Sequence, residues 1–148
     1  MAKFQYSLQS ILEIKTKLET RAKQEFAKAQ GLLAEEEQKL KELEKRRLMY
    51  EEKTRSLLQG VLNVREIEEN KTAILVVEGY IAEQTVRVEH AREQVERARE
   101  EMTGAMRERK THETLRDQEF EEFLQEENKS EGKAVDELVS YTYGQKGR

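Results

Sequence analysis

The amino-acid sequence predicts an all-α protein, a long antiparallel two-helix coiled-coil hairpin with a C-terminal helical extension or tail. The 148-residue chain has no proline and seven glycines, so residues that break helices or form turns are scarce. Charged residues make up 39% of the chain, with Glu, Lys, Arg, Gln and Leu abundant, a composition typical of long helices. Apolar residues recur every seven positions over much of the chain, which indicates a coiled coil rather than a sheet.

The first predicted helix covers about residues 3–58, and its apolar residues form three runs with seven-residue spacing. These runs are Phe4, Ile11 and Leu18, then Phe26, Leu33 and Leu40, then Leu43, Tyr50 and Leu57. Because the phase changes from one run to the next, we expect a stutter and local unwinding of the supercoil.

A turn is predicted at about residues 59–63, the only good break in the sequence. Gly60 can cap the end of the first helix, and Asn63 can cap the start of the second, with Glu66 at its third position. Such a short connection requires the two helices to run antiparallel.

The second predicted helix covers about residues 64–125 and has the clearest heptad pattern. One series is Ile67, Ile74, Ile81, Val88, Val95 and Met102, and the other is Val77, Gln84, Ala91, Ala98 and Ala105. The alanines allow the helices to approach closely. The polar exception, Gln84, can fix the register at some cost in stability.

Residues 126–148 form the predicted tail of this single domain, residues 1–148. Folding back at Gly60 places Phe4 beside residues 115–120, so the chain beyond Phe123 extends past the start of the first helix. The tail begins with the polar stretch 126–132. Its apolar residues are Ala134, Val135, Leu138, Val139, Tyr141 and Tyr143. No partner within the hairpin reaches this stripe, so we expect an external one. A hairpin without a third layer buries little apolar area, which predicts modest stability.

Charge and composition argue against several classes of function. The net charge of −4 comes from 31 acidic and 27 basic residues that are mixed along the chain, unlike a nucleic-acid binder. The densest basic cluster, Lys45-Arg46-Arg47, lacks interleaved aromatic residues, and we expect it on the exposed side of the first helix, where a protein partner could contact it. No apolar run is long enough to span a membrane and no signal peptide is recognisable, so we expect a cytoplasmic protein.

Catalytic and metal-binding patterns are also missing from the sequence. His90 and His112 lie about 33 Å apart on one predicted helix, too far to share a metal ion. The chain has no cysteine and no glycine-rich phosphate-binding loop. We therefore expect no enzyme activity, no cofactor and no metal.

Three segments resemble those of a known family, in the same order and over nearly the whole chain. They are FQYSLQSILEIKTKLE at the start, LLQGVLNVREIEENKTAILVVEGYI in the middle and KSEGKAVDELVSYTYGQK at the end. The family is FliJ, the small coiled-coil component of the bacterial flagellar type III export apparatus. Each segment alone is weakly specific, whereas the three together are considerably more so.

The resemblance implies a function in flagellum biogenesis, and hence in motility and chemotaxis. FliJ is similar to the central stalk subunit of rotary ATPases. The resemblance implies that the chain binds the ring of the export ATPase, FliI, regulates it and links it to the export gate protein, FlhA. It further implies contacts with export chaperones and peripheral association with the cytoplasmic side of the cell membrane.

The same resemblance places a gate-binding surface near the hairpin tip. The matching residues are Leu43, Tyr50, Val77, Tyr80 and Gln84. Where some relatives carry further aromatic residues, this chain has Arg46 and Ala73. Seam packing accounts equally well for the first three, whereas Tyr80, beside Ile81, is expected to face away from the seam.

The ATPase-binding candidates implied by the resemblance lie at the terminal end of the hairpin. They are Phe4, Leu8, Ile11, Phe120, Phe123, Leu124, Asp136, Glu137 and Leu138. For the first six the alternative is packing within the hairpin, and for the last three it is a frayed tail.

Two other functions remain open from the sequence. An export chaperone or escort protein could hold unfolded export substrates on the C-terminal apolar stripe. A generic structural scaffold could pair in parallel through the same seams, although Gly60 and the changes of phase disfavour one continuous helix.

Overall fold

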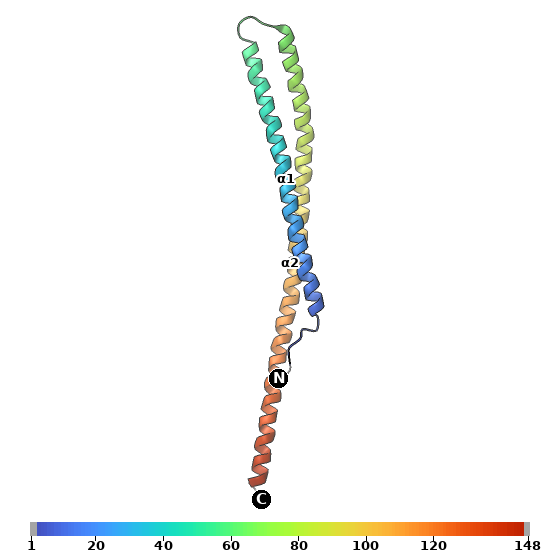
Figure 1. The fold of residues 1–148 in the computed structure, drawn as a ribbon, viewed down its shortest axis with the longest axis vertical. Coiled ribbons are helices and arrows are strands. Elements are labelled where there is room, and N and C mark those ends of the chain that lie inside the picture. The colour runs from blue at the N-terminus through green and yellow to red at the C-terminus, as the bar shows by residue number, and fades with distance from the viewer. Residues whose placement is uncertain (1–2, 147–148) are drawn as a thin grey trace. The chain divides into compact units, whose positions relative to one another are not determined.

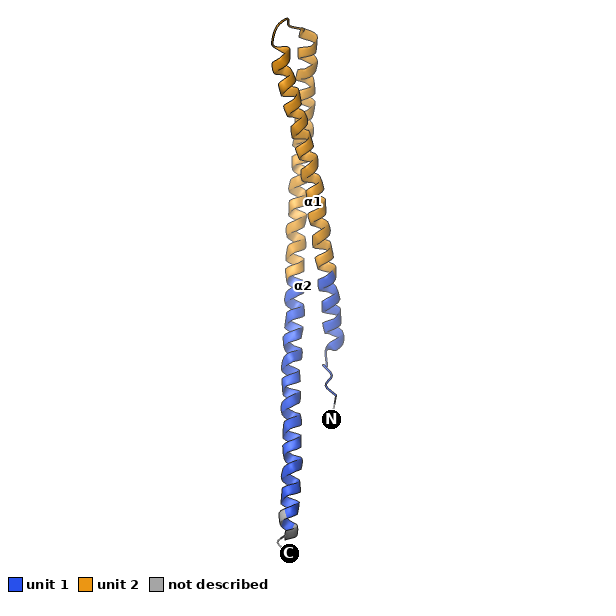
Figure 2. Ribbon diagram, turned by 60° about the vertical axis from the view of Figure 1, so that its left-hand side comes forward, with its two compact units in different colours: residues 1–20, 104–148 blue, residues 21–103 orange. Residues whose placement is uncertain are grey.

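The computed structural model describes residues 3–146, which form two α-helices packed against each other, α1 (Gln9–Leu57) and α2 (Val64–Lys146) (Figure 1). No strand occurs among these residues, and the predicted antiparallel coiled-coil hairpin is confirmed. The chain divides into two compact units, each containing a part of both helices (Figure 2). Unit 1 comprises residues 1–20 and 104–148, and unit 2 comprises residues 21–103.

The turn that joins the helices lies in unit 2 and follows the predicted capping pattern. Residues 58–63 lie between the helices, and Gly60 has a φ of 75°, in the left-handed region that favours glycine. The Asn63 side-chain oxygen accepts a hydrogen bond from the Glu66 backbone N–H at 3.3 Å, which caps the first turn of α2.

The seam of unit 2 contains the residues that the heptad pattern of α2 predicts. Val77, Val88 and Val95 are buried, and Ile67, Ile74 and Ile81 are half-buried. The polar exception, Gln84, is buried as well. Its amide nitrogen donates to the Glu36 backbone carbonyl at 3.0 Å and also to the Glu36 carboxylate. This side chain therefore ties the two helices together across the seam.

The predicted stutter in α1 is wrong, because its buried and half-buried positions keep one heptad phase. In unit 2, apart from Glu51, these positions alternate in steps of three and four residues: Ala22, Phe26, Ala29, Leu33, Glu36, Leu40, Leu43, Arg47, Tyr50, Thr54 and Leu57. In unit 1 the same alternation occurs at Leu12, Lys15 and Glu19. Polar residues occupy several of these positions, so the apolar residues alone gave a broken pattern.

The start of α1 also differs from the prediction. The helix begins at Gln9 rather than near residue 3, and the Gln9 N–H donates to the Tyr6 carbonyl at 3.1 Å. The non-helical residues 3–8 bring Phe4 and Tyr6 against α2, and Tyr6 is buried. Leu12 takes the buried position in unit 1 because it has the same heptad phase as Lys15 and Glu19, and Ile11 remains exposed.

Of the two predicted alternatives for the C-terminal segment, a helical extension or a tail, the structure has the helical extension. The helix extends to Lys146, so residues 126–146 form a helical extension. They include no proline and many strong helix formers, with Gly132 and Gly144 the unfavourable residues. Because a helix satisfies its own backbone hydrogen bonds, this segment needs no packing partner to keep its backbone groups paired.

Candidate functional site

The predicted gate-binding residues of unit 2 occupy three different environments. Val77 and Gln84 are buried in the seam, at 3% and 5% exposure. Leu43 and Tyr50 are half-buried at its margin, and the Tyr50 carbonyl accepts a hydrogen bond from the Asn70 amide at 2.8 Å. Tyr80 faces outward and is 51% exposed. Of these five residues, Tyr80 therefore exposes the most side-chain surface to a partner. Val77 and Gln84 instead pack between the two helices and stabilise their pairing.

Two adjoining hollows lie beside these residues on unit 2. One has a volume of about 270 Å³ and is lined by Leu43, Tyr80 and Gln84, among others. The other has a volume of about 490 Å³ and is lined by Met49 and Tyr50, among others. Arg46 lines both hollows.

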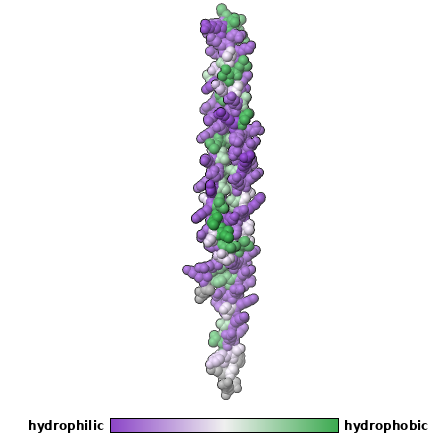
Figure 3. Space-filling view, turned by 90° about the vertical axis from the view of Figure 1, so that its right-hand side faces the viewer, coloured by the Kyte–Doolittle hydropathy of each residue, from purple (hydrophilic) through white to green (hydrophobic). Residues whose placement is uncertain are grey.

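The turn carries exposed apolar residues that the sequence analysis did not single out. Leu58 and Leu62 are more than half exposed, and Val61 is 99% exposed. Figure 3 shows apolar side chains at this end of the hairpin. The signal available in the sequence was the presence of four aliphatic residues around Gly60, where a solvated turn ordinarily carries polar ones.

At the terminal end, three predicted residues form an aromatic cluster in unit 1. The ring centroids of Phe4 and Phe120 are 4.9 Å apart in an edge-to-face arrangement, and those of Phe4 and Phe123 are 5.5 Å apart. Phe120 and Leu124 remain more than 40% exposed. Leu8 and Ile11 are also exposed, at 39% and 38%. The aromatic cluster therefore packs within unit 1, and Phe120 and the neighbouring Leu124 still expose apolar surface to solvent.

Polar contacts hold the start of α1 against α2 in unit 1. The Lys15 ammonium lies 2.8 Å from the Glu108 carboxylate, and this hydrogen bond lowers the pKa of Glu108 below its ordinary value of 4.5. Further towards the N-terminus, the Ser7 N–H and hydroxyl donate to the two carboxylate oxygens of Glu119 at 3.2 and 3.0 Å. These contacts fix the segment that carries the aromatic cluster.

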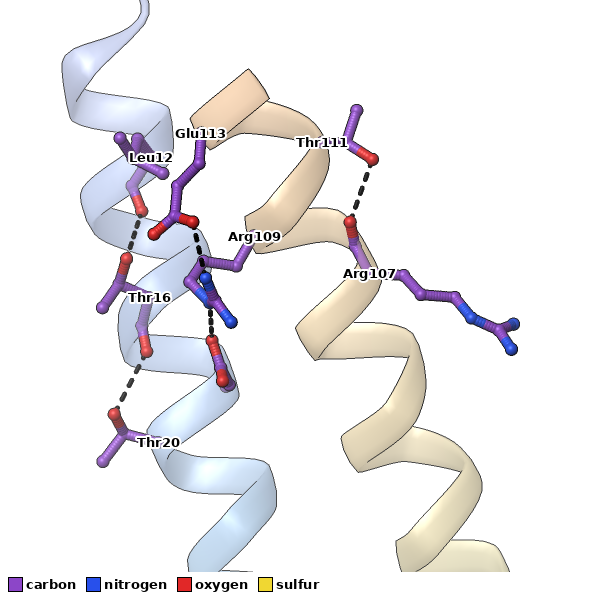
Figure 4. A network of polar contacts seen from close by, with 8 residues as sticks. Leu12, Thr16, Thr20, Arg107, Arg109, Thr111 and Glu113 are labelled. Carbon is purple, nitrogen blue, oxygen red and sulfur yellow. Dashed lines mark hydrogen bonds and ion pairs between the residues drawn. The ribbon is translucent and has the colours of Figure 1, made fainter. Parts of the chain in front are cut away.

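Arg109 forms the centre of a charged network in the seam of unit 1 (Figure 4). Its guanidinium donates to the buried Glu19 carboxylate of α1 and, at 2.7 Å, to Glu113 of its own helix. The hydrogen bond that Arg109 donates to Glu19, followed by the one it donates to Glu113, raises the pKa of Arg109 above its ordinary value. The arginine is therefore permanently charged and serves to pair buried acid rather than to transfer protons.

Two residues important to this end, Tyr6 and His112, were not among the predicted binding residues. Tyr6 is 6% exposed, and its hydroxyl lies 3.5 Å from His112 Nδ1. Helical spacing misses Tyr6 because it precedes the helix. Its aromatic character two residues after Phe4 was the available signal.

The C-terminal extension presents the remaining predicted residues. Asp136, Glu137 and Leu138 are exposed, and so are the neighbouring Val135, Val139 and Tyr141. The Tyr143 side chain, which the sequence analysis assigned to the same apolar stripe, lies outside the described residues. The extension thus carries an exposed apolar stripe flanked by carboxylates.

The described part of the chain offers no group of three His, Cys, Asp or Glu residues placed to hold a metal ion. Within residues 3–146, no helix has both the length and the apolar character needed to cross a membrane.

Comparisons with known proteins agree with the resemblance seen in the sequence. The structure is similar to that of CT670 from Chlamydia trachomatis, described as a homolog of YscO. The TM-score is 0.61 and the sequence identity is 26%, covering 95% of this chain and 96% of that chain. No curated protein matches the sequence significantly. The family described as the flagellar FliJ protein matches residues 4–148. The chain therefore belongs to the FliJ family, whose members are structural components of flagellar type III protein export.

Proposed function

We propose that this protein is a non-enzymatic component of the flagellar export apparatus that binds the export ATPase ring and links it to the export gate. In this proposal the terminal end, in unit 1, contacts the ATPase FliI, and the hairpin end, in unit 2, contacts the gate protein FlhA. The protein would then act peripherally, at the cytoplasmic side of the cell membrane, and contact export chaperones as further partners.

The observation that carries the ATPase part of the proposal is the exposed aromatic cluster of unit 1. Phe120 and Leu124 are accessible, and the rings of Phe4 and Phe123 pack against Phe120. Aromatic side chains, phenylalanine included, are enriched in protein–protein interfaces relative to the rest of the surface. The stripe of the C-terminal extension, with Leu138 and Val139, adds apolar surface in the same unit.

Unit 2 supports the gate part of the proposal through Tyr80. Its ring is half exposed beside a hollow, and the seam residues Val77 and Gln84 keep the supporting helix in place. A tyrosine so placed offers both apolar area and a hydrogen-bonding hydroxyl to a partner.

The proposed mechanism is geometric. An asymmetric hairpin in a ring of identical subunits cannot contact all of them alike, so it favours the subunit states that it binds best. Such coupling needs a difference in contact free energy between these states.

The deciding experiment measures ATP hydrolysis by FliI with and without this protein, together with electron microscopy of ring formation. We expect stimulation and rings with a central density. Replacing Phe120 and Leu124 with serine should weaken stimulation about tenfold or more, because both side chains lie at the proposed contact.

The matched control replaces two exposed apolar residues of unit 2, Leu48 and Val86, with serine and should leave stimulation unchanged. Equal loss in both variants, or no effect of the wild-type protein, would refute the proposed ATPase contact. ATP hydrolysis by the purified protein alone would refute the non-enzymatic part of the proposal.

The exposed stripe on the C-terminal extension also favours a second function, an export chaperone that holds unfolded substrates. Deletion of residues 126–148 separates the two. Loss of substrate binding with ATPase binding retained would support the chaperone, and loss of ATPase binding would support the proposal above. A parallel scaffold fits less well, since the structure has an antiparallel hairpin.

A further inference from the structure

Five basic side chains gather around the two adjoining hollows of unit 2, and we call them the basic strip. They are Lys39, Lys45, Arg46 and Lys53 of α1 and Arg87 of α2. Two carboxylates, Glu42 and Glu83, line the same hollows, and Lys39 lies 3.6 Å from the Glu36 carboxylate, so five positive and three negative charges leave a net charge of +2. The protein as a whole has a net charge of −4, so this surface has the opposite sign.

Three members of the basic strip have no partner within the described part of the chain. Among the described residues, no carboxylate forms an ion pair with Lys45, Arg46 or Lys53. Elsewhere in unit 2, Arg65 and Arg99 each lie within 4 Å of a glutamate one helical turn away. The cations outnumber the carboxylates around the two hollows, so part of their mutual repulsion is left uncompensated. A negatively charged partner would relieve this repulsion, so the strip is complementary to an anion.

Apolar side chains lie among these cations. Met49 is 69% exposed and Tyr80 51% exposed, and the half-buried Leu43 and Tyr50 lie behind them. Met, Tyr and Arg are enriched where proteins bind other proteins. An anion that lacks apolar groups would leave Met49 and Tyr80 in water, so the best partner carries both kinds of group.

We propose that the basic strip binds an acidic protein segment in which an apolar side chain lies between carboxylates. The carboxylates would pair with Arg46 and its basic neighbours, and the apolar side chain would enter the hollow beside Tyr80 or Met49. This inference rests on the proposed function, because the strip surrounds the gate-facing residues and assigns an acidic contact segment to the gate.

A protein segment fits this surface better than a nucleic acid or an anionic membrane. Glu42 lines both hollows and lies among the cations, where a regular row of phosphates would meet it. A short segment of protein can place its carboxylates on either side of that glutamate. Two hollows of limited volume also suit single side chains better than a flat lipid surface.

The test compares two triple variants of the full-length protein that change the charge equally. The strip variant carries Lys45→Glu, Arg46→Glu and Lys53→Glu. The control variant carries Lys41→Glu, Arg55→Glu and Lys71→Glu, which are exposed, lie in the same unit and line neither hollow. Circular dichroism is used to check that both variants are as helical as wild type.

Each variant is titrated with the cytoplasmic domain of FlhA at 50 and 500 mM NaCl. At low salt we expect the strip variant to bind about 30-fold more weakly than wild type and the control variant less than about 3-fold more weakly. At high salt the difference should shrink to about 3-fold, since exposed charges are then screened. Equal weakening in both variants, or none in the strip variant, would overturn the inference while leaving wild-type gate binding intact.

A second probe keeps the inference testable when the gate does not bind. It is a fluorescein-labelled peptide of six Glu and Asp residues around two leucines, compared with the same peptide carrying Gln and Asn. Preferential binding of the acidic peptide, lost in the strip variant, would support the inference even if the gate contact fails. No preference would overturn it.

The same variants are tested with a single-stranded RNA 20-mer and with vesicles containing 30% phosphatidylglycerol. If the strip variant loses binding to either of these, and wild type binds it more tightly than the acidic peptide, the partner is a polyanion and the inference is overturned.

Discussion

The seams of the two units follow the same heptad spacing but are built from different chemistry. In unit 2 the seam positions of α2 are mainly Ile, Val and Ala, with Asn70 and Gln84 as buried polar residues that hydrogen-bond to α1. In unit 1 the corresponding positions of α2 after Ala105 are Arg109, His112, Arg116 and Glu119, each half-buried. Spacing therefore determines which residues face the partner helix, whereas residue type determines how strongly they hold it.

This difference predicts that the two units open at different cost. Apolar burial, which depends little on pH or salt, contributes more to the seam of unit 2, whereas ion pairs that water and salt weaken contribute more to the seam of unit 1. Stability varies within a structure, and segments used for binding are often less stable than the rest. In unit 1 the aromatic cluster proposed to bind the ATPase lies beside these polar contacts.

The largest expected effect comes from placing a charge in the apolar seam of unit 2. Val88 is 3% exposed, so Val88→Asp should destabilise the protein by about 3 kcal/mol or more, because it buries a carboxylate without a partner. Urea unfolding followed by circular dichroism measures the loss. Val86→Asp, two residues away and 67% exposed, should cost less than about 0.5 kcal/mol. Similar losses in the two variants would show that the seam does not stabilise unit 2.

A smaller and more local effect is expected at the charged network of unit 1. Arg109→Ala leaves the Glu19 carboxylate without its arginine, which should lower hydrogen-exchange protection of amides 12–20 roughly tenfold. Protection of amides 70–90 in unit 2 should stay unchanged. Replacing Glu19 and Arg109 together with leucine should restore or increase protection, since an apolar pair suits this seam position. A double variant less protected than Arg109→Ala would contradict this explanation.

The turn of unit 2 supplies an effect of about 1 kcal/mol. Gly60→Ala places a side chain at a φ of 75° and should destabilise by about that amount, with no clash because no atom lies within 4 Å of the added Cβ. Gly79→Ala lies inside α2, also with no atom within 4 Å, and should stabilise by about 0.5–1 kcal/mol. Thermal unfolding of the two variants should therefore shift in opposite directions.

The smallest effect concerns pH and salt. The Lys15 hydrogen bond lowers the pKa of Glu108 in the folded protein, so the stability it contributes is present above the ordinary value of 4.5 and is lost as pH falls below it. The hydrogen bond from Gln84 likewise lowers the pKa of Glu36. NMR titration should show the pKa of Glu108 rising in 0.5 M NaCl and in Lys15→Met. The pKa of Glu36 should respond less to salt, because its main partner is a neutral amide. Equal salt sensitivity would contradict this distinction between the units.

Much of the hairpin could be predicted from residue spacing. Gly60 and Asn63 identified the turn, the heptads of α2 identified its seam, and folding back at Gly60 correctly placed Phe4 beside Phe120. These features depend on local backbone preferences and on the fixed rise of a helix, which short sequence patterns express directly.

The candidate sites were less predictable, because exposure depends on both helices. Tyr80 and Val77 are three residues apart in the same helix, yet one is 51% exposed and the other 3%. The basic strip combines residues of α1 with Arg87 of α2, and its members become neighbours only when the hairpin closes. Sequence spacing had suggested Lys45-Arg46-Arg47 as one cluster, whereas Arg47 takes a seam position.

Helical character and the position of the turn followed from composition and capping residues, since both arise from interactions within a few residues of chain. The phase of α1, the burial of Tyr6 and the pairing of Glu19 with Arg109 required the packed structure. A glutamate or arginine is stable in a seam only when the opposite helix supplies its partner, and no pattern within one helix reveals that partner.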